Sequence, residues 1–294
     1  MTKQPMPFRR MVLGLPHSAG DYAAVHTAAD LAEVLGIDLL ATFIEDTGLR
    51  GLADLPGMRE LQPLGAGWRS IDTAQLTRDI ERAAGTARRL FAEATRTRGI
   101  KARFDVAHGP AAEIVSALVQ TDDILVVIEP KNPAERITQQ FTALLDAAYK
   151  SASAMMLIPS RVARTSGPII AIALSLDDPS IPVALATAAA TKEHLIVLGV
   201  SGQRVSSSDL DEAARAVGVT VESMSSSAAP IDGRTLAAAL APLRERLVVV
   251  TRGTFDDVVP SIVASLRAVP VLVLEPAKQA DIELQAGDES QAAQ

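Results

Sequence analysis

Residues 123–159, DILVVIEPKNPAERITQQFTALLDAAYKSASAMMLIP, read as a strand, a loop, a helix and a second strand. Residues 245–276, ERLVVVTRGTFDDVVPSIVASLRAVPVLVLEP, read in the same order. In both stretches the strands are short runs of Val, Ile, Leu and Met, namely 124–128 and 154–158 in the first and 247–251 and 271–274 in the second. Such units predict parallel strands joined by right-handed crossovers. The repeat indicates an internal duplication.

The loop after the first strand of each stretch decides whether a phosphate could bind there. Phosphate loops expose backbone N–H groups at close range, which glycine permits and bulkier residues obstruct. The first copy has Glu129, Pro130, Lys131 and Asn132 at this point, with no glycine. The loop is therefore predicted to lack an anion cradle.

Composition excludes several classes of function. The chain has 294 residues, enough for two domains that each bury a core, and a formal net charge of −7, which argues against nucleic acid or an anionic membrane surface as the main partner. It has no cysteine, so disulfides, thiolate catalysis and cysteine-ligated metals are excluded. The N-terminal apolar run, Met11 to Leu15, is too short for a signal peptide. We therefore expect a cytoplasmic protein.

Strands and helices alternate along the whole chain. This pattern predicts an α/β fold with two parallel sheets, each covered by helices on both faces, in domains 8–160 and 167–276, the second shorter and divergent. Residues 160–168 are predicted to be a linker, and the polar tail 277–294 is predicted to be disordered. The predicted strands are 11–15, 37–44, 101–107, 124–128 and 154–158, then 169–174, 195–200, 219–224, 247–251 and 271–274. The predicted helices outside the quoted stretches are 21–35, 72–98 and 110–120, then 182–191, 208–217 and 232–243.

The segment 47–70 is unusually long for a connection inside a compact domain. We expect a loop with one short helical stretch, because apolar residues recur there at every third position: Leu49, Leu52, Leu55, Met58, Leu61 and Leu64. This stripe could cover its own domain as a lid, or it could bind a partner. Both interpretations remain open.

Three stretches carry a resemblance to a known family. They are MVLGLPHSAGDYAAVHTAADLAEVLG from Met11, FIEDTGLRGLADLPGMREL from Phe43, and DDILVVIEP with the later LIPS from Asp122 and Leu157. The chain resembles the universal stress protein family, particularly the proteobacterial members with two domains in tandem. The resemblance implies two Rossmann-like domains, each a mostly parallel five-stranded sheet flanked by helices. It also implies a stress-response role and pairing of the two fifth strands, which a tandem chain can satisfy internally.

The resemblance also locates the family's nucleotide-binding positions on this chain. Its glycine–glycine–glycine–hydroxyl motif falls on Glu129, Asn132, Thr142 and Ala143, and none of the four matches. The aspartate that follows the family's first strand falls on Pro16 in the first domain and on Ser175 in the second. Ser18 and Gly109 match, but each also suits an ordinary turn or helix cap. We therefore expect no bound nucleotide and no cofactor.

Other candidate chemistry is weak. The four histidines, His17, His26, His108 and His194, lack the spacing of a metal site, and no nucleophile elbow surrounds Ser18. Glu45 and Asp46 follow the second strand, where α/β proteins bind ligands, although a solvated turn is the better interpretation. The arginines of residues 72–98 alternate with carboxylates, as on a solvated helix face. No catalytic residue and no metal ligand is predicted, and a hydrolase is the least supported function.

The sequence thus predicts a non-catalytic universal stress protein that binds a protein or a small molecule without ATP. The alternative is a nucleotide-binding stress sensor, for ATP or AMP, that uses altered contacts in the cleft. Besides the pairing within the chain, a homodimer is possible. Neither nucleic acid nor a membrane is expected as a partner.

Overall fold

The computed structural model describes residues 7–16, 22–45, 51, 55, 59–61, 67–130, 139–200, 202, 204–226 and 232–276. The predicted tail 277–294 lies outside the described residues, as do His17, Ser18, Asp46 and Asn132.

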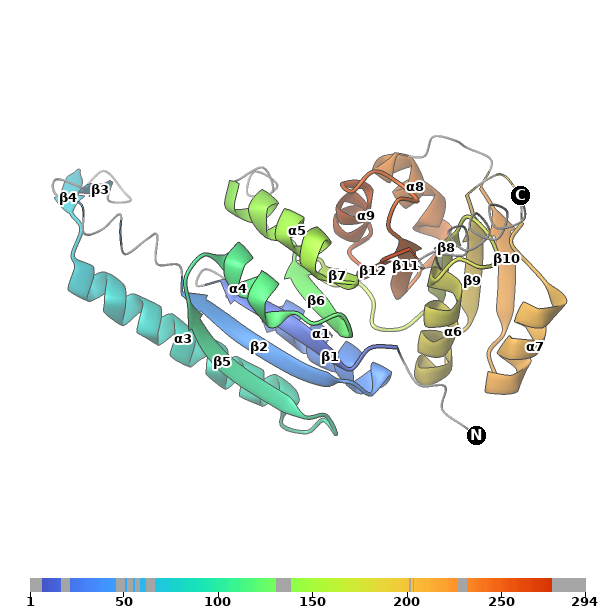
Figure 1. Ribbon diagram of the computed structural model, residues 1–294, viewed down its shortest axis with the longest axis horizontal. Coiled ribbons are helices and arrows are strands. Elements are labelled where there is room, and N and C mark those ends of the chain that lie inside the picture. The colour runs from blue at the N-terminus through green and yellow to red at the C-terminus, as the bar shows by residue number, and fades with distance from the viewer. Residues whose placement is uncertain are drawn as a thin grey trace, which may run out of the picture.

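One ten-stranded sheet runs through the molecule (Figure 1). Its strand order is β10-β9-β8-β11-β12-β7-β6-β1-β2-β5. The first half contributes β1 Arg10–Pro16, β2 Asp38–Glu45, β5 Ala102–His108, β6 Asp123–Ile128 and β7 Ala154–Ile158. The second half contributes β8 Ile169–Ala173, β9 Leu195–Gly199, β10 Val221–Ser225, β11 Leu247–Thr251 and β12 Val271–Leu274. Strands within each half are parallel, and read outward from the centre the two halves have the same topology, which confirms the α/β fold and its duplication.

Helices cover both faces of the sheet, as the alternation of strands and helices predicts. One face carries α1 Tyr22–Leu35, α3 Thr73–Thr95, α6 Ser180–Thr191 and α7 Ser208–Val217. The other face carries α4 Ala111–Leu118, α5 Gln139–Ser151, α8 Gly233–Leu240 and α9 Val259–Arg267. The predicted helix 232–243 is divided, because a 3-10 turn, η3 Ala241–Leu243, follows α8. Among the described residues, no helix has the combined length and apolarity needed to cross a bilayer.

The two halves join through their fifth strands, as predicted. β12 pairs with β7 antiparallel, with Val271 opposite Leu157 and Leu274 opposite Ala154. The apolar layers on the two faces also continue across this boundary: α1 packs against α6 on one face, and α9 packs against β7 on the other. Each face has one core that both halves share.

A buried carboxylate lies at the start of the fourth strand in the first half and just before it in the second. Asp123 is fully buried and accepts two hydrogen bonds from Arg10, Nε–Oδ1 at 2.9 Å and Nη2–Oδ2 at 2.6 Å. This carboxylate raises the pKa of Arg10 above its ordinary value, although partial burial opposes the shift. Glu245 is also fully buried, with Arg267 Nε at 2.8 Å and Arg164 Nη2 at 3.8 Å. The same structural task is thus met by arginines from different elements.

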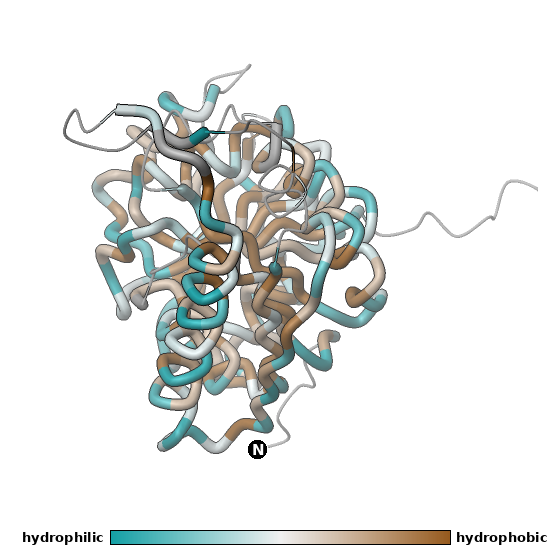
Figure 2. The backbone as a smooth tube through the Cα atoms, turned by 90° about the vertical axis from the view of Figure 1, so that its left-hand side faces the viewer, coloured by the Kyte–Doolittle hydropathy of each residue, from teal (hydrophilic) through white to brown (hydrophobic). Residues whose placement is uncertain are grey.

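The segment 47–70 departs from its predicted structure. Its described part contains an antiparallel hairpin, β3 Arg59–Leu61 with β4 Trp68–Ser70. The leucine stripe therefore does not form one helix through Leu61, because Pro63 and the glycines at 65 and 67 break helical continuation. Of the other stripe residues only Leu55 is described, and it is 51% exposed. Figure 2 views the molecule from this end, with α3 in front and the hairpin above it.

Candidate functional site

The topology places one crevice in each half. In an open α/β sheet, ligands bind at the carboxyl ends of the strands where the strand order reverses. The reversal lies between β1 and β6 in the first half and between β8 and β11 in the second. Because β7 and β12 are antiparallel, the two crevices open at opposite edges of the sheet.

In the first half, Glu129 is the residue after β6, where the resemblance predicts the start of a phosphate loop. Its side chain is buried, with 1% of its surface exposed. Its backbone N–H donates to the carbonyl of Ile158 at 2.8 Å and so extends the β6–β7 ladder. Of the remaining family positions, Thr142 and Ala143 lie in the first turn of α5, and Pro16 ends β1 opposite Ile44. Ser18 and Asn132 lie outside the described residues.

The second half repeats this backbone arrangement. Arg252 follows β11 as Glu129 follows β6, and its N–H donates to the carbonyl of Leu274 at 2.7 Å. In both halves the first N–H of the expected phosphate loop is therefore already used by the sheet.

A hydrogen-bond network around Asp178 lies at the second crevice. This residue, 6% exposed, lies in the loop after β8. Its Oδ1 accepts from Thr251 Oγ1 at 2.5 Å and from the backbone N–H of Ser180 at 3.0 Å, and its Oδ2 accepts from the N–H of Leu174 at 3.1 Å. Thr251 is the last residue of β11, so its hydrogen bond links β11 to the loop after β8 at the point where the strand order reverses. Ser175, the predicted equivalent of the family's aspartate, is exposed and lies beside this network.

Sequence reasoning missed Asp178. The available signal was the run Asp177-Asp178-Pro179-Ser180 after a buried strand, since an aspartate side chain in a turn commonly accepts a hydrogen bond from the backbone N–H two residues further on. The partner Thr251 is 73 residues away, and only the pairing of β8 with β11 brings the two together.

A glutamate and a histidine meet at the end of β2 and β5. Glu45 and His108 lie opposite each other in the β2–β5 register, with Oε2 and Nε2 3.5 Å apart. Gly109 donates its N–H to the carbonyl of Glu45 at 3.0 Å. Its φ of +139° is one that glycine adopts readily and other residues rarely adopt, which explains why a glycine occupies this position. This pair could exchange a proton, but it lies one strand away from the crevice beside β6. The solvated-turn interpretation of Glu45 is wrong, because Glu45 is the last residue of β2 and is 6% exposed.

A polar clamp joins the two halves beside the second crevice. The guanidinium of Arg252 stacks over the ring of Tyr149 on α5, 5.0 Å from its centroid, and lies 3.5 Å from Glu275. The hydroxyl of Tyr149 donates to the carbonyl of Asp257 at 2.8 Å. Burial raises the pKa of Tyr149 well above its ordinary value. The clamp is built from α5 of one half and the β11–α9 loop of the other.

The described residues offer little reactive chemistry. Within these ranges no three His, Asp or Glu side chains gather as a metal site would require. His26 on α1 and His194 before β9 lie on separate elements, and His17 lies outside the description.

Comparison with known proteins bears on the fold. No family model matches the chain, and no curated protein matches it. A universal stress protein from Archaeoglobus fulgidus DSM 4304 superposes with a TM-score of 0.62 at 14% identity, over 94% of this chain and 99% of that one. A protein of unknown function from Pseudomonas aeruginosa PAO1 gives a TM-score of 0.49 at 15% identity, over 97% and 98% of the two chains. The resemblance noted in the sequence is therefore supported at the level of structure: this chain has the tandem fold of a universal stress protein.

Proposed function

We propose that this chain is a non-catalytic, cytoplasmic universal stress protein that acts by binding a partner and does not bind ATP. Its working units are the two predicted domains, 8–160 and 167–276, held as one sheet. The observation that carries the proposal is the Asp178 network, in which the protein's own groups hydrogen-bond to one another at the second crevice.

The first crevice supports the same conclusion for a different reason. A buried carboxylate at Glu129 stands where a triphosphate would bring several negative charges. Like charges at short range in a protein interior repel strongly, and this repulsion would lower the affinity for the ligand. Loss of the loop glycines adds to this effect.

The alternative is a sensor that binds ATP or AMP through altered contacts. The pair of Glu45 and His108 favours it, because a histidine at the carboxyl edge of the sheet can donate to an anionic or ribose oxygen. The chain would then use the edge of the first crevice instead of its centre.

Titration calorimetry with Mg-ATP and with AMP distinguishes the two functions. The proposal expects no binding heat, and it expects native mass spectrometry of freshly purified protein to show no nucleotide. Thermal unfolding gives an independent measurement, because ligand at a hundred times its dissociation constant stabilises the folded state by about 2.7 kcal/mol. A dissociation constant in the low micromolar range, which corresponds to a binding free energy of about −8 kcal/mol, would contradict the proposal and support the nucleotide sensor.

A further inference from the structure

The first edge of the ten-stranded sheet, β5, is an open strand with little protection. No described strand pairs with its outer side. An open edge exposes backbone N–H and C=O groups, and proteins usually protect it with a very short strand, a bulge, a proline or charges. β5 has seven residues, contains no proline, and pairs with β2 without interruption from Ala102 to His108. Only its charges remain as protection.

The hydrogen bonds to β2 show which backbone groups of β5 face outward. The carbonyl of Lys101 accepts from the N–H of Leu39, and the N–H of Gly109 donates to the carbonyl of Glu45. Odd-numbered residues of β5 therefore face β2, and even-numbered residues face away from the sheet, because the direction alternates along a strand. The outward-facing residues in the middle of the strand are Ala102, Phe104 and Val106.

The two charges of β5 are complementary to a second copy of the same strand. Arg103 and Asp105 lie on one face, with Nε and Oδ2 2.9 Å apart, and their side chains are 77% and 35% exposed. In an antiparallel pair with its two-fold axis at Phe104, Arg103 of each copy lies opposite Asp105 of the other. An axis one residue away in either direction would place arginine opposite arginine or aspartate opposite aspartate, which is destabilising. Charge therefore selects one register.

The backbone and the apolar side chains fit this register. Phe104 then lies opposite Phe104, and Ala102 lies opposite Val106. Each such pair of outward-facing residues exchanges two backbone hydrogen bonds. Val106, which is 38% exposed in the single chain, gains an apolar neighbour across the axis.

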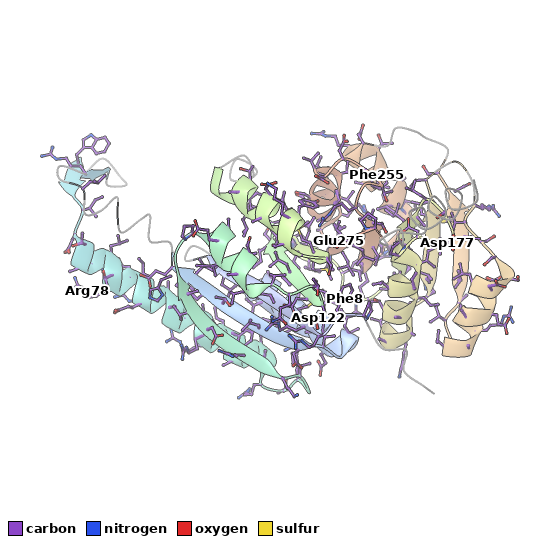
Figure 3. All side chains as sticks on the ribbon, in the orientation of Figure 1. Phe8, Arg78, Asp122, Asp177, Phe255 and Glu275 are labelled. Atoms are coloured by element: carbon purple, nitrogen blue, oxygen red, sulfur yellow. The ribbon has the colours of Figure 1, made fainter. Side chains whose placement is uncertain are left out.

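Arg88 of α3 opposes the pair. Its guanidinium lies over the ring of Phe104, 5.2 Å from the centroid, so two copies would bring two such groups toward one axis. Like charges repel, and we therefore expect a weak dimer. The end of α3 that extends past β5 does not add to this effect, because Figure 3 labels Arg78 beyond the end of the strand and away from its middle.

The second edge of the sheet lacks this complementarity. β10 has five residues and a single charged side chain, Glu222. A two-fold axis at Glu222 would place like charges opposite each other, and an axis at Ser223 would place Glu222 opposite Met224. Figure 1 shows β10 in the other half of the molecule from β5. Pairing at β5 alone gives a closed dimer, because the same surface is used on both copies.

We propose that β5 is a dimerisation edge, at which two copies of this chain pair antiparallel about a two-fold axis at Phe104. Arg103 of each copy contacts Asp105 of the other, and one sheet continues through both copies. This inference goes beyond the proposed function and does not depend on whether a nucleotide binds.

Charge reversal tests the contact in both directions. Arg103→Asp and Asp105→Arg each place like charges opposite each other at both contacts of the dimer. Sedimentation velocity of the full chain, from about 1 µM to about 1 mM, should show a parent dimer and at least about tenfold weaker association of either variant alone. An equimolar mixture of the two variants restores opposite charges at both contacts. The mixture should dimerise within about threefold of the parent.

The matched control lies on the other edge. Glu222→Arg changes the net charge of the chain as much as Asp105→Arg does, and Glu222 is also exposed on an edge strand. This variant should leave the dimer dissociation constant unchanged.

Two further variants test the strand pairing itself. Ala102→Pro removes an outward N–H at the first residue of β5, where proline is tolerated, and should weaken the dimer about tenfold. Because the chain has no cysteine, a spin label on Lys101→Cys reports the register. Residue 101 lies opposite residue 107 of the other copy, so the two labelled Cα atoms should be about 20 Å apart, the length of six strand residues.

Three results would overturn the proposal. The first is a parent protein that stays monomeric up to about 1 mM. The second is a dimer that ignores the single reversals or is not restored by mixing the two variants. The third is a label distance that does not fit the register, or growth beyond the dimer, since either would place the contact elsewhere. Nucleotide binding enters none of these measurements, so the proposed function is tested separately by the Mg-ATP titration.

Discussion

Glu129 and Arg252 occupy the same place in the two halves and differ in almost everything beyond their backbone. Each follows the fourth strand of its half, and each donates its N–H to the end of the fifth strand, at 2.8 Å and 2.7 Å. The Glu129 side chain is buried, whereas Arg252 reaches across the boundary to stack on Tyr149. The two halves therefore share the backbone hydrogen bond at this position but place the side chain in different surroundings.

This difference shows how the tandem has become one unit. In the second half, the first side chain of the loop after the fourth strand contacts the first half, because Arg252 lies over the ring of Tyr149. The Asp178 network and the clamp at Arg252 both involve Thr251 or the residues that follow it.

The largest effect is expected from breaking the joint between the halves. Val273 is 1% exposed in β12 and lies opposite Met155 of β7. Val273→Lys buries an unpaired charge at the centre of the sheet and should cost at least about 4 kcal/mol in urea unfolding. Val106→Lys, on the outer edge strand β5 where the valine is 38% exposed, should stay within about 0.5 kcal/mol. Equal losses in the two variants would mean that the joint has no special role.

Next in size is the loss of a buried carboxylate. Glu245→Ala leaves the guanidinium of Arg267, whose side chain is 14% exposed, without its carboxylate partner. It should lower the free energy of unfolding by about 3–5 kcal/mol. Asp123→Ala likewise removes the partner of Arg10. Because the Arg10 side chain is 22% exposed and better reached by water, the loss of unfolding free energy should lie at the lower end of that range. Chemical denaturation of both variants compares the halves directly. Asp122→Ala, which loses an ion pair to Arg9 that is about half exposed, is the control and should cost less than about 1 kcal/mol.

The features that could be predicted from sequence are those set by local pattern. Apolar runs bounded by turn residues located the strands, and the apolar ends of both repeats predicted the pairing of β7 with β12. Asp178 was missed because an aspartate in a loop is normally solvated, and its burial depends on Thr251 arriving from a distant strand. The hairpin was missed because leucines at every third position fit a helix as well as they fit an irregular segment with short strands.

The Asp178 network should contribute an intermediate amount of stability. Asp178→Ala removes the acceptor of one hydroxyl and two backbone N–H groups, which should cost about 2–3 kcal/mol. Thr251→Val removes a single hydrogen bond to the same carboxylate and should cost about half as much. Thr42→Val in the first half is the matched control, since the buried Thr42 hydroxyl has no hydrogen-bond partner among the described residues. Thr42→Val should leave the free energy of unfolding unchanged or raise it slightly. A clear decrease would contradict the statement that the Thr42 hydroxyl has no partner there.

The clamp should have a smaller effect, but one specific to the boundary. Arg252→Ala loses the stacking on Tyr149 and a 3.3 Å hydrogen bond to the carbonyl of Ala152, together about 1–2 kcal/mol. Hydrogen exchange should show reduced protection in β7 and β12. Arg88→Ala removes a similar contact over Phe104, at 5.2 Å, inside the first half. If both variants loosen β7 and β12 equally, Arg252 does not act as a clamp.

The smallest effect appears only at alkaline pH. Burial raises the pKa of Tyr149 above the ordinary value of 10.0, so above pH 10 the unfolded chain loses this proton before the folded chain does. The contribution of Tyr149 is therefore complete below pH 10 and is lost as the pH rises through the folded-state pKa. Tyr149→Phe should cost about 1 kcal/mol at pH 7, because the hydrogen bond to Asp257 is absent, and the variant should lose less stability than the parent between pH 10 and pH 11. Urea unfolding at pH 7 and across that interval measures both quantities. Parallel curves for parent and variant would mean that Tyr149 titrates alike in the folded and unfolded chains, and the buried environment assigned to the clamp would then be wrong.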